Sequence, residues 1–232
     1  MDMFFGNIDD KGDLVLHHDE VNHCFRVMRK KAGDRIGVMN GKGLIWEADI
    51  NEMTSKTGVL SNFQKVISNV LLPYTMHLAV APTKNAERIE WLLEKSIEIG
   101  IHHFTLLYTH RTERKRVNIE RLEKIAVAAL KQSCQPILPT ITECNFKEFV
   151  TKRTTQAKFI ASCKGFSNIQ PISALANTSD IVVMVGPEGD FTDEEYNAAL
   201  QHEFIPISFG TQRLRTETAA LLAVMSRYSL QN

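Results

Sequence analysis

The sequence predicts two parts, a small β-barrel first and then an α/β domain with a largely parallel sheet. Up to about Pro73, short runs of alternating apolar and polar residues are separated by glycine turns, which is typical of a small barrel. After Pro73, apolar strand-like runs alternate with amphipathic helical segments, which is typical of parallel strands covered by helices. We therefore expect residues 1–70 to form the barrel and residues 73–232 to form the second domain.

A hairpin signal supports the barrel. Residues 34–39 lead into the turn sequence Asn-Gly-Lys-Gly, and residues 44–50 then alternate apolar with polar side chains. Residues 57–60 and 63–67 are further short runs that are typical of strands. Several short strands joined by glycine turns within roughly 70 residues favour a barrel over an open sheet.

The second part contains alternating strand and helix signals. Strand-like apolar runs occupy residues 76–81, 103–108, 158–162, 181–185 and 204–208. Helices are expected over residues 85–100, 118–133 and 193–201, and from about Glu217 onward. Asn85 is a suitable N-cap for the first of these helices, and Gly100 is suitable to end it. This β-α alternation predicts a largely parallel sheet.

Composition narrows the class of protein. Lys plus Arg and Asp plus Glu number 27 each, so the formal net charge is zero and any nucleic-acid role must depend on local patches. No apolar run is long enough to cross a membrane, and the first residues do not resemble a signal peptide. The four cysteines form no C-x-x-C pair, so neither a zinc site nor a disulfide framework is expected. We expect a cytoplasmic protein with free thiols, no metal and no membrane contact.

The stretch VGPEGDFTDEEY, residues 185–196, follows an apolar strand and opens a helix, a junction where α/β proteins often bind ligands. Thr192 and Glu195 have capping-box spacing, and the acids between them suit the positive end of the helix dipole. Because carboxylates occupy this helix end and phosphate-loop patterns are missing, nucleoside triphosphates and dinucleotides are excluded. Gly186 and Gly189 would allow close backbone approach to a neutral or cationic ligand, and an ordinary turn explains them equally well.

A second strand-to-helix junction lies at residues 208–221. Phe209 and Gly210 form its turn, and Arg213, Arg215 and Glu217 bring charge to it. Because the carboxyl ends of parallel strands meet at one edge of a sheet, we expect the two junctions to lie side by side there.

Two segments are locally basic, residues 17–31 and residues 110–116. Judged on charge alone, a solvated surface is the simpler interpretation of each segment.

Two motifs, GPEGDF and SFGTQRLRTETA, resemble those of the RsmE family of ribosomal RNA uracil-N3 methyltransferases, which belong to the SPOUT superfamily. In the first motif Asp190 replaces the second glycine of the family's G-G, and in the second Gln212 replaces an arginine. The segments HCFRVMR, EKSIEIG, HRTER and KQS are also similar to family segments in the same order. Gln135, after KQS, stands where the family usually has arginine. The resemblance spans almost the whole chain.

This resemblance implies a PUA-like barrel followed by an α/β domain with a deep trefoil knot, a feature that is very rare in proteins. It also implies a homodimer whose cofactor pocket lies at or near the subunit interface. The implied activity is methylation of N3 of a uridine in small-subunit (16S) ribosomal RNA, with S-adenosylmethionine as the methyl donor. That cofactor carries a sulfonium and an ammonium group and no phosphate, which agrees with the acidic helix start.

The resemblance further implies which residues form the site. Those expected to hold the cofactor are Ser162, Val185, Gly186, Pro187, Glu188, Gly189, Phe209, Gly210, Leu214, Arg215, Thr218 and Ala219. Arg215 is expected to stabilise the uracil anion, and Glu217 is a weaker candidate for the base that takes the N3 proton. The alternative role for Arg215 is a structural salt bridge, and the alternative for Glu217 is to accept hydrogen bonds from N–H groups at the start of its helix. Glu188 is expected either to form a hydrogen bond with the ribose or to stabilise its own turn.

Under this resemblance the basic segments become candidate phosphate contacts. The residues concerned are His23, Arg26, Arg29, Lys30, Arg111, Arg114, Lys115 and Arg116. Methylating N3, an atom buried in base pairing, requires an extruded or already unpaired base. Two other functions stay open: a non-catalytic RNA-binding protein with a degenerate knot domain, and a SPOUT methyltransferase that acts on another RNA such as transfer RNA.

Overall fold

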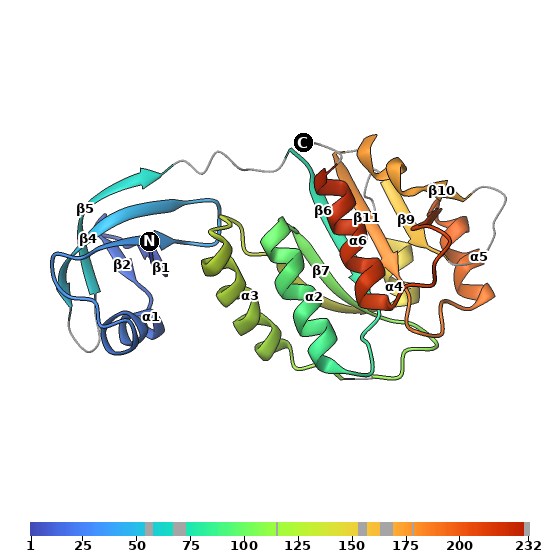
Figure 1. Ribbon diagram of the computed structural model, residues 1–232, viewed down its shortest axis with the longest axis horizontal. Helices are drawn as coiled ribbons and strands as arrows, with labels where there is room; N and C mark the ends of the chain where they lie inside the picture. The colour runs from blue at the N-terminus through green and yellow to red at the C-terminus, as the bar shows by residue number, and fades with distance from the viewer. Residues whose placement is uncertain are drawn as a thin grey trace. The chain divides into compact units, whose positions relative to one another are not determined.

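The chain divides into two compact units in the computed structural model (Figure 1). The structure describes residues 1–53, 58–66, 73–114, 116–152, 157–162, 169–177 and 179–229. The first unit is Met1–Leu71 together with Leu130–Leu138, and the second is Leu72–Ala129 together with Pro139–Asn232. Within the described residues, no helix is long and apolar enough to cross a membrane.

The first unit contains a closed five-stranded barrel, as predicted, in the order β1-β2-β5-β4-β3. Its strands are β1 (Met3–Ile8), β2 (Leu14–Leu16), β3 (Arg35–Met39), β4 (Ile45–Met53) and β5 (Gly58–Val66). The barrel closes because β1 pairs in parallel with β3, and apolar side chains such as Phe4, Ile36 and Leu60 fill its interior. The two short runs expected near its end form one strand, β5, in which Asn62 has a positive φ of 48°.

Two short helical turns follow β2, and the sequence pattern did not indicate either. They are α1 (His18–Asn22) and the π-helix η1 (His23–Val27). The turn ends at Arg29, which has φ 53°, a left-handed conformation that lets the Lys30 N–H donate to the Cys24 carbonyl. Cys24 points into the core, where burial raises the pKa of its thiol to about 11. This cysteine is therefore a packing residue rather than a reactive thiol.

The end of helix α3 (Ile119–Ser133) and the loop after it group with the barrel. The Lys131 ammonium lies 2.7 Å from the Glu20 carboxylate, with both side chains mostly buried. Backbone hydrogen bonds join Gly43 to Pro136 and Leu138 to Gly41. These contacts explain why residues 130–138 belong to the first unit and the rest of α3 to the second.

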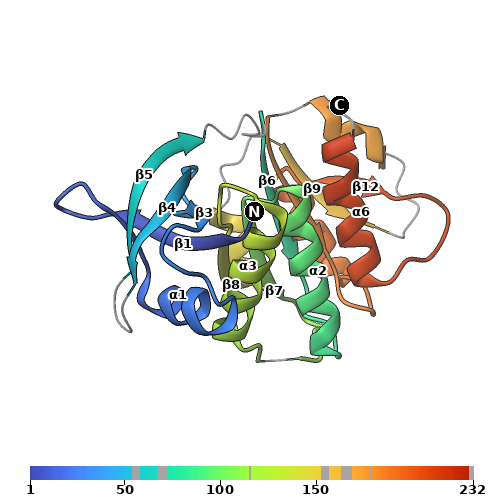
Figure 2. The ribbon, with the colours of Figure 1, turned by 60° about the vertical axis from the view of Figure 1, so that its left-hand side comes forward.

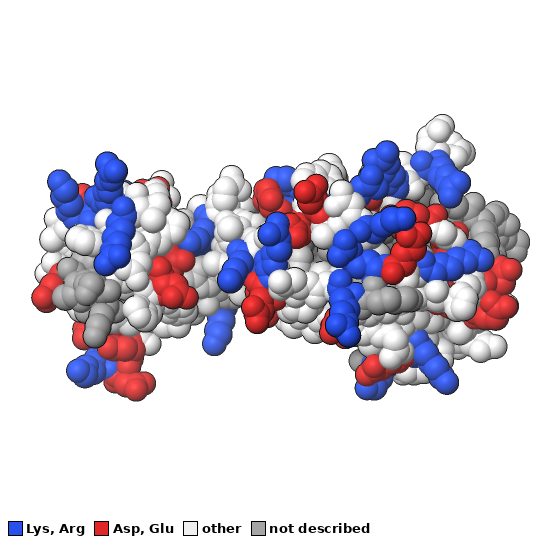
Figure 3. Space-filling view, turned by 90° about the horizontal axis from the view of Figure 1, so that it is seen from below, with Lys and Arg blue, Asp and Glu red and all other residues white. Residues whose placement is uncertain are grey.

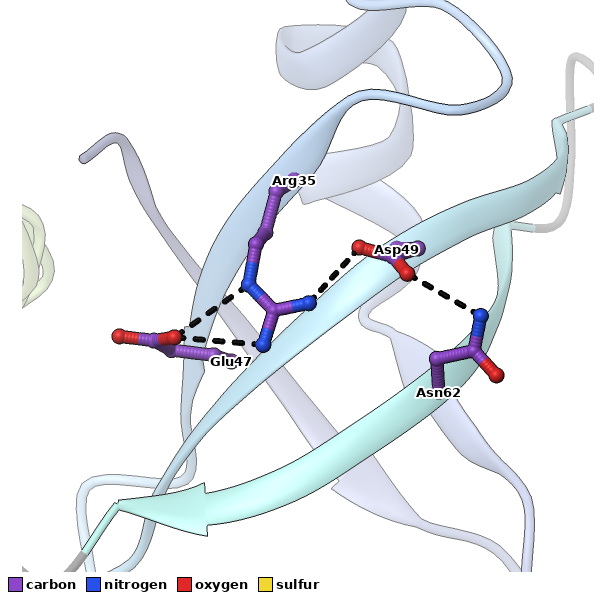
Figure 4. Close-up of polar contacts among 4 residues, drawn as sticks. All are labelled: Arg35, Glu47, Asp49 and Asn62. Atoms are coloured by element: carbon purple, nitrogen blue, oxygen red, sulfur yellow. Dashed lines mark hydrogen bonds and ion pairs between the residues drawn. The ribbon is translucent and has the colours of Figure 1, made fainter.

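A polar network covers part of the barrel's outer surface (Figure 4). The Arg35 guanidinium donates to Glu47 Oε2 at 3.3 Å and to Asp49 Oδ1 at 3.0 Å. Asn62 donates to the other Asp49 oxygen at 3.1 Å. Glu47 and Asp49 are two residues apart on β4, so their side chains lie on one face of the strand and both contact the Arg35 guanidinium.

The second unit contains a seven-stranded sheet in the order β10-β12-β9-β11-β6-β7-β8, and every strand pair in it is parallel, as predicted. Its strands are β6 (Thr75–Val80), β7 (His103–Tyr108), β8 (Thr140–Asn145), β9 (Ala157–Ala161), β10 (Gln170–Pro171), β11 (Asp180–Val185) and β12 (Ile205–Ser208). The small barrel and the α/β domain with a parallel sheet are thus both present, as expected for the fold class. The trefoil knot stays a prediction.

Helices cover the sheet. They are α2 (Ala86–Ile99), α3, α4 (Phe146–Lys152), α5 (Asp193–Gln201) and α6 (Thr216–Ser229), with a 3-10 turn η2 (Ile172–Asn177). Helices α2 and α6 lie side by side in both ribbon views (Figures 1 and 2). Side chains of α4 and α5, including Phe149 and Tyr196, pack with strand residues such as Met184 in one apolar cluster.

Local capping fixes the ends of these helices, as the sequence predicts. The Asn85 side chain accepts from the Glu87 N–H at 2.9 Å, and Gly100 ends α2 with φ 112°. Near the end of α6 the fully buried Arg227 guanidinium stacks 4.2 Å from the ring centre of Tyr74. Desolvation lowers the pKa of Arg227, and burial raises the pKa of Tyr74 to about 12. This cation-π contact holds α6 against the segment that enters β6.

Candidate functional site

A pocket lies where three neighbouring parallel strands end. Strand β9 pairs with β12 on one side and with β11 on the other, so the segments that follow these strands meet at one edge of the sheet. The pocket has a volume of about 660 Å³. Its lining residues are Ala161, Ser162, residues 185–190, residues 209–216 and Ala219.

Close neighbours favour glycine at both positions of the first loop. A Cβ on Gly186 would lie 3.1 Å from ring carbons of Phe191, which is fully buried. A Cβ on Gly189 would lie 3.2 Å from Cδ of Arg111. Such distances are tighter than ordinary van der Waals contact, so a larger residue at either position would displace a neighbour.

The carbonyl oxygens of this loop are engaged by the protein itself. Val185 accepts from the Ala81 N–H, and Pro187 accepts from the Asp190 N–H, both at 2.9 Å. The other acceptors are Gly186 from the Thr216 hydroxyl (3.0 Å), Glu188 from Arg213 (3.4 Å) and Gly189 from Arg111 (2.6 Å). Within the described residues, the N–H groups of Glu188 and Gly189 donate to no protein acceptor. The loop therefore offers hydrogen-bond donors to a ligand.

Asp190 stabilises the turn from within. Its φ of 61° is left-handed, a conformation that Asp tolerates better than most residues. Its Oδ1 accepts from the Phe191 N–H at 2.8 Å and lies 2.9 Å from the Tyr196 hydroxyl oxygen. That hydroxyl is also 2.9 Å from the Ala161 carbonyl, and its single proton serves one acceptor at a time. The Asp190 carboxylate thus has a local structural function.

The acids after the turn cap helix α5, as the sequence predicts. The Thr192 hydroxyl accepts from the Glu195 N–H at 3.2 Å, and Glu195 Oε2 accepts from the Thr192 N–H at 2.9 Å. Backbone and hydroxyl hydrogen bonds lower the pKa of Glu194. The positive end of this helix is therefore satisfied internally.

The second loop meets the first through helix α6. Thr216, the first residue of α6, donates its buried hydroxyl to the Gly186 carbonyl. Gly210 has φ 112°, and its N–H and carbonyl both lie 3.2 Å from the Ser208 hydroxyl. This local turn directs residues 211–215 along the pocket wall.

The structure brings together nearly all of the residues expected to hold a cofactor. Every one of them lines the pocket except Thr218, which is exposed on α6. Residues 211–213 also line the pocket and lie in the same loop, between the expected residues Gly210 and Leu214. The sequence reasoning missed three lining residues: Ala161, Asp190 and Thr216. Each is next in sequence to an expected residue, so its position beside the motifs could have predicted that it lines the pocket. Their roles toward a ligand stay predictions.

The two candidate catalytic residues have different surroundings. Arg215 is exposed and lines the pocket. Glu217 does not line it; the side chain is buried, and its Oε1 lies 3.5 Å from the Arg88 guanidinium of α2. Its buried Oε2 has no hydrogen-bond partner within the described residues. The contact between Glu217 and Arg88 joins α6 to α2. It favours a structural role for Glu217 at the start of α6 over a role as catalytic base.

The candidate RNA contacts also differ from one another. His23, Arg26 and Arg29 are exposed on the barrel, whereas Lys30 is ion-paired with Asp2 at 2.7 Å.

In the second basic segment, Arg111 and Arg114 donate to backbone carbonyls, and Arg116 is exposed. Lys115 lies outside the described residues. Figure 3 shows basic and acidic side chains interspersed, in keeping with the zero net charge. Among the described residues no group of His, Cys, Asp or Glu could hold a metal ion.

The chain combines an α/β domain that has a pocket at its strand ends with a small β-barrel, and comparison with known proteins identifies the class to which this combination belongs. A family model described as an RNA methyltransferase domain matches residues 71–227, and an RNA methyltransferase PUA domain matches residues 18–62. The chain belongs to this RNA methyltransferase family. Its resemblance to the RsmE proteins, inferred from the motifs, is confirmed.

Named relatives cover nearly the whole chain. The ribosomal RNA small subunit methyltransferase E of Buchnera aphidicola (from Acyrthosiphon pisum) is 29% identical, over 94% of this chain and 89% of the relative. The Bacillus subtilis protein of the same name is 25% identical, over 94% and 90%.

Solved structures agree in fold. A probable rRNA-methyltransferase from Porphyromonas gingivalis has a TM-score of 0.88 and 33% identity, covering 100% of this chain and 98% of that one. A Legionella pneumophila methyltransferase solved with bound S-adenosylmethionine has a TM-score of 0.83 and 26% identity, covering 99% and 96%.

Asp190→Ala is expected to lower the free energy of unfolding by about 1–3 kcal/mol, because the Phe191 N–H loses its acceptor, the Tyr196 hydroxyl keeps only the Ala161 carbonyl, and the left-handed backbone is strained. Asp190→Asn keeps both an acceptor oxygen and tolerance of that conformation, so a change below about 1 kcal/mol is expected. Urea denaturation of the two variants measures the difference. Equal destabilisation by Ala and Asn would contradict the structural function of this side chain.

Proposed function

We propose that this protein methylates N3 of a uridine in small-subunit (16S) ribosomal RNA, with S-adenosylmethionine as methyl donor. The observation that carries the proposal is the pocket, whose walls are the two loops that hold the family motifs. The relatives named as ribosomal RNA small subunit methyltransferases and the cofactor-bound Legionella structure support it.

The pocket suits the chemistry of S-adenosylmethionine. Bound there, the cofactor would supply an activated methyl group on a sulfonium. The Glu188 and Gly189 N–H groups face no protein acceptor within the described residues, so they are available to ribose, adenine or carboxylate oxygen and nitrogen atoms. The capped start of α5 offers no vacant anion site, which disfavours phosphate-bearing ligands. The residues present therefore fit this cofactor.

Arg215 is the side chain best placed to act on the base. Uracil N3 becomes a good nucleophile only when its proton leaves, and a fixed cation stabilises the resulting anion. Arg215 is exposed at the pocket wall, and within the described residues no carboxylate forms an ion pair with it. Its charge is thus available to a substrate. Glu217, held by Arg88, is the weaker candidate for a direct role.

The barrel supplies a surface for RNA under this proposal. Arg26 and Arg29 are exposed and form no ion pair with any described residue, and Phe25 between His23 and Arg26 is 49% exposed. Cations neutralise phosphates, and an aromatic ring can stack on an unpaired base. An unpaired or extruded uridine is what N3 methylation requires.

We also propose a cytoplasmic homodimer. Three large apolar side chains on the adjacent helices α2 and α6 are exposed: Trp91 (44%), Met225 (47%) and Tyr228 (39%). Covering them with a second copy would bury apolar area that a monomer leaves in water. Light scattering is expected to give the mass of a dimer, reduced by Met225→Glu. A monomeric wild-type protein would contradict this.

Arg215→Ala is expected to reduce turnover roughly 100-fold or more while the unfolding free energy stays unchanged, because the charge acts on the reacting base. Mass spectrometry of nucleosides after reaction with small-subunit RNA measures 3-methyluridine. Wild-type turnover in the variant would refute the role. Failure of the wild-type protein to bind S-adenosylmethionine in calorimetry would favour the non-catalytic RNA-binding alternative, and a product only in transfer RNA would change the substrate.

Arg26→Ala combined with Arg29→Ala is expected to weaken RNA binding and reduce the slope of log affinity against log salt by about 2, one for each lost phosphate contact. Arg35→Ala is the matched control, because Glu47 and Asp49 already neutralise that guanidinium. Fluorescence anisotropy at several salt concentrations measures both. An unchanged slope in the double variant would remove the barrel arginines from the interface.

A further inference from the structure

The loop after β7 is a rigid turn beside the pocket. The Thr112 hydroxyl oxygen lies 2.9 Å from both the Thr109 N–H nitrogen and the Thr109 hydroxyl, and both threonines are buried. The Thr112 N–H donates back to the Thr109 carbonyl at 3.2 Å. Residues 110 and 111, at the tip of this turn, are exposed and have little freedom to move independently of it.

Arg111 spans from this turn to the pocket loop. Its Nη1 donates to the Gly189 carbonyl at 2.6 Å and lies 3.5 Å from the Phe191 carbonyl. Its aliphatic stem covers Gly189 so closely that a Cβ there would meet Cδ at 3.2 Å. A charged donor on a backbone carbonyl forms one of the stronger hydrogen bonds in proteins.

A second contact holds the same two segments together. The His110 N–H donates to Glu195 Oε1 at 2.8 Å, while Glu195 Oε2 accepts from the Thr192 N–H. One carboxylate therefore both caps α5 and secures the β7 loop.

Arg114 extends the connection to a third loop. Its Nη2 donates to the Lys84 carbonyl at 2.7 Å, and its Nε lies 3.2 Å from the Thr83 and Lys84 carbonyls. The three connected loops follow β7, β6 and β11, which are neighbours in the sheet. Arg111 and Arg114 thus connect the loop after β7 to the loops after β11 and β6 at this edge of the sheet.

We propose that Arg111 is a positioning residue for cofactor binding: it holds the Gly189 carbonyl so that the Glu188 and Gly189 N–H groups face the pocket. Its role is to fix backbone donors rather than to neutralise an RNA phosphate. This inference rests on the proposed function, because it assigns S-adenosylmethionine as the ligand of those donors.

The first test separates the two roles of Arg111. Arg111→Ala is expected to raise the Kd of S-adenosylmethionine in calorimetry roughly 10-fold, the equivalent of one lost charge-assisted hydrogen bond. Arg111→Lys, which can still donate to one carbonyl, is expected to recover part of the affinity. Arg116→Ala, an exposed arginine of the same segment, is the control and should leave the Kd unchanged. The salt slope of RNA binding should not change in Arg111→Ala.

A double-mutant cycle tests the contact itself. Gly189→Ala alone should weaken cofactor binding, because the new Cβ pushes against the Arg111 stem. In the Arg111→Ala background that obstacle is gone, so the same substitution should have a smaller effect. Additive effects, or an unchanged Kd together with a salt slope reduced by about 1 in Arg111→Ala, would overturn the proposal in favour of a phosphate contact.

Hydrogen exchange tests the positioning without the cofactor. The Asp190 N–H, bonded to the Pro187 carbonyl, should exchange faster in Arg111→Ala than in Arg116→Ala or the wild-type protein. Exchange unaffected by Arg111→Ala would overturn the inference. If the wild-type protein fails to bind S-adenosylmethionine while the turn still loosens in Arg111→Ala, the choice of cofactor is wrong and the positioning role stands.

Discussion

Thr216 donates its hydroxyl to the Gly186 carbonyl, and this buried hydrogen bond joins two loops whose strands are not neighbours. Strand β9 lies between β11 and β12, so each loop must reach over the end of β9 to meet the other. Because Thr216 is also the first residue of α6, the bond fixes where that helix starts and therefore how it lies along α2. The same contact therefore links the pocket to the helix pair.

Structural features that depend only on residues close together in the chain could be predicted from the sequence. The caps at Asn85, Gly100 and Thr192 are local hydrogen bonds or local backbone conformations, and the buried strands of the parallel sheet are continuous apolar runs. Strand β8 escaped prediction because it lies at the sheet edge with mostly polar, exposed residues. The barrel strand β1 escaped because its pairing with β3 is non-local, and the π-helix η1 has no simple hydrophobic period.

The candidate site divides in the same way. The lining residues of both loops could be predicted because the motifs are contiguous and parallel strands bring their ends together. The contacts of Asp190 and Arg111 could not be predicted. Those of Asp190 depend on a left-handed backbone and on the position of the Tyr196 hydroxyl, and that of Arg111 depends on a distant carbonyl. Arg111 and Gly189 are 78 residues apart, and a basic segment read alone suggests a solvent-facing surface. Only the fold shows that two of its arginines donate to backbone carbonyls.

The carbonyl groups of residues 185–189 all accept hydrogen bonds from the protein itself, so what this loop has left to offer a ligand is peptide N–H. A peptide donor neither titrates near neutral pH nor depends on the identity of its side chain. Backbone N–H groups can therefore keep binding the same ligand when side chains of the loop are substituted, provided that the turn keeps its conformation. That offers a physical reason why this loop can carry Asp190, whose side chain stabilises the turn and leaves the Glu188 and Gly189 N–H groups unbonded by the described residues.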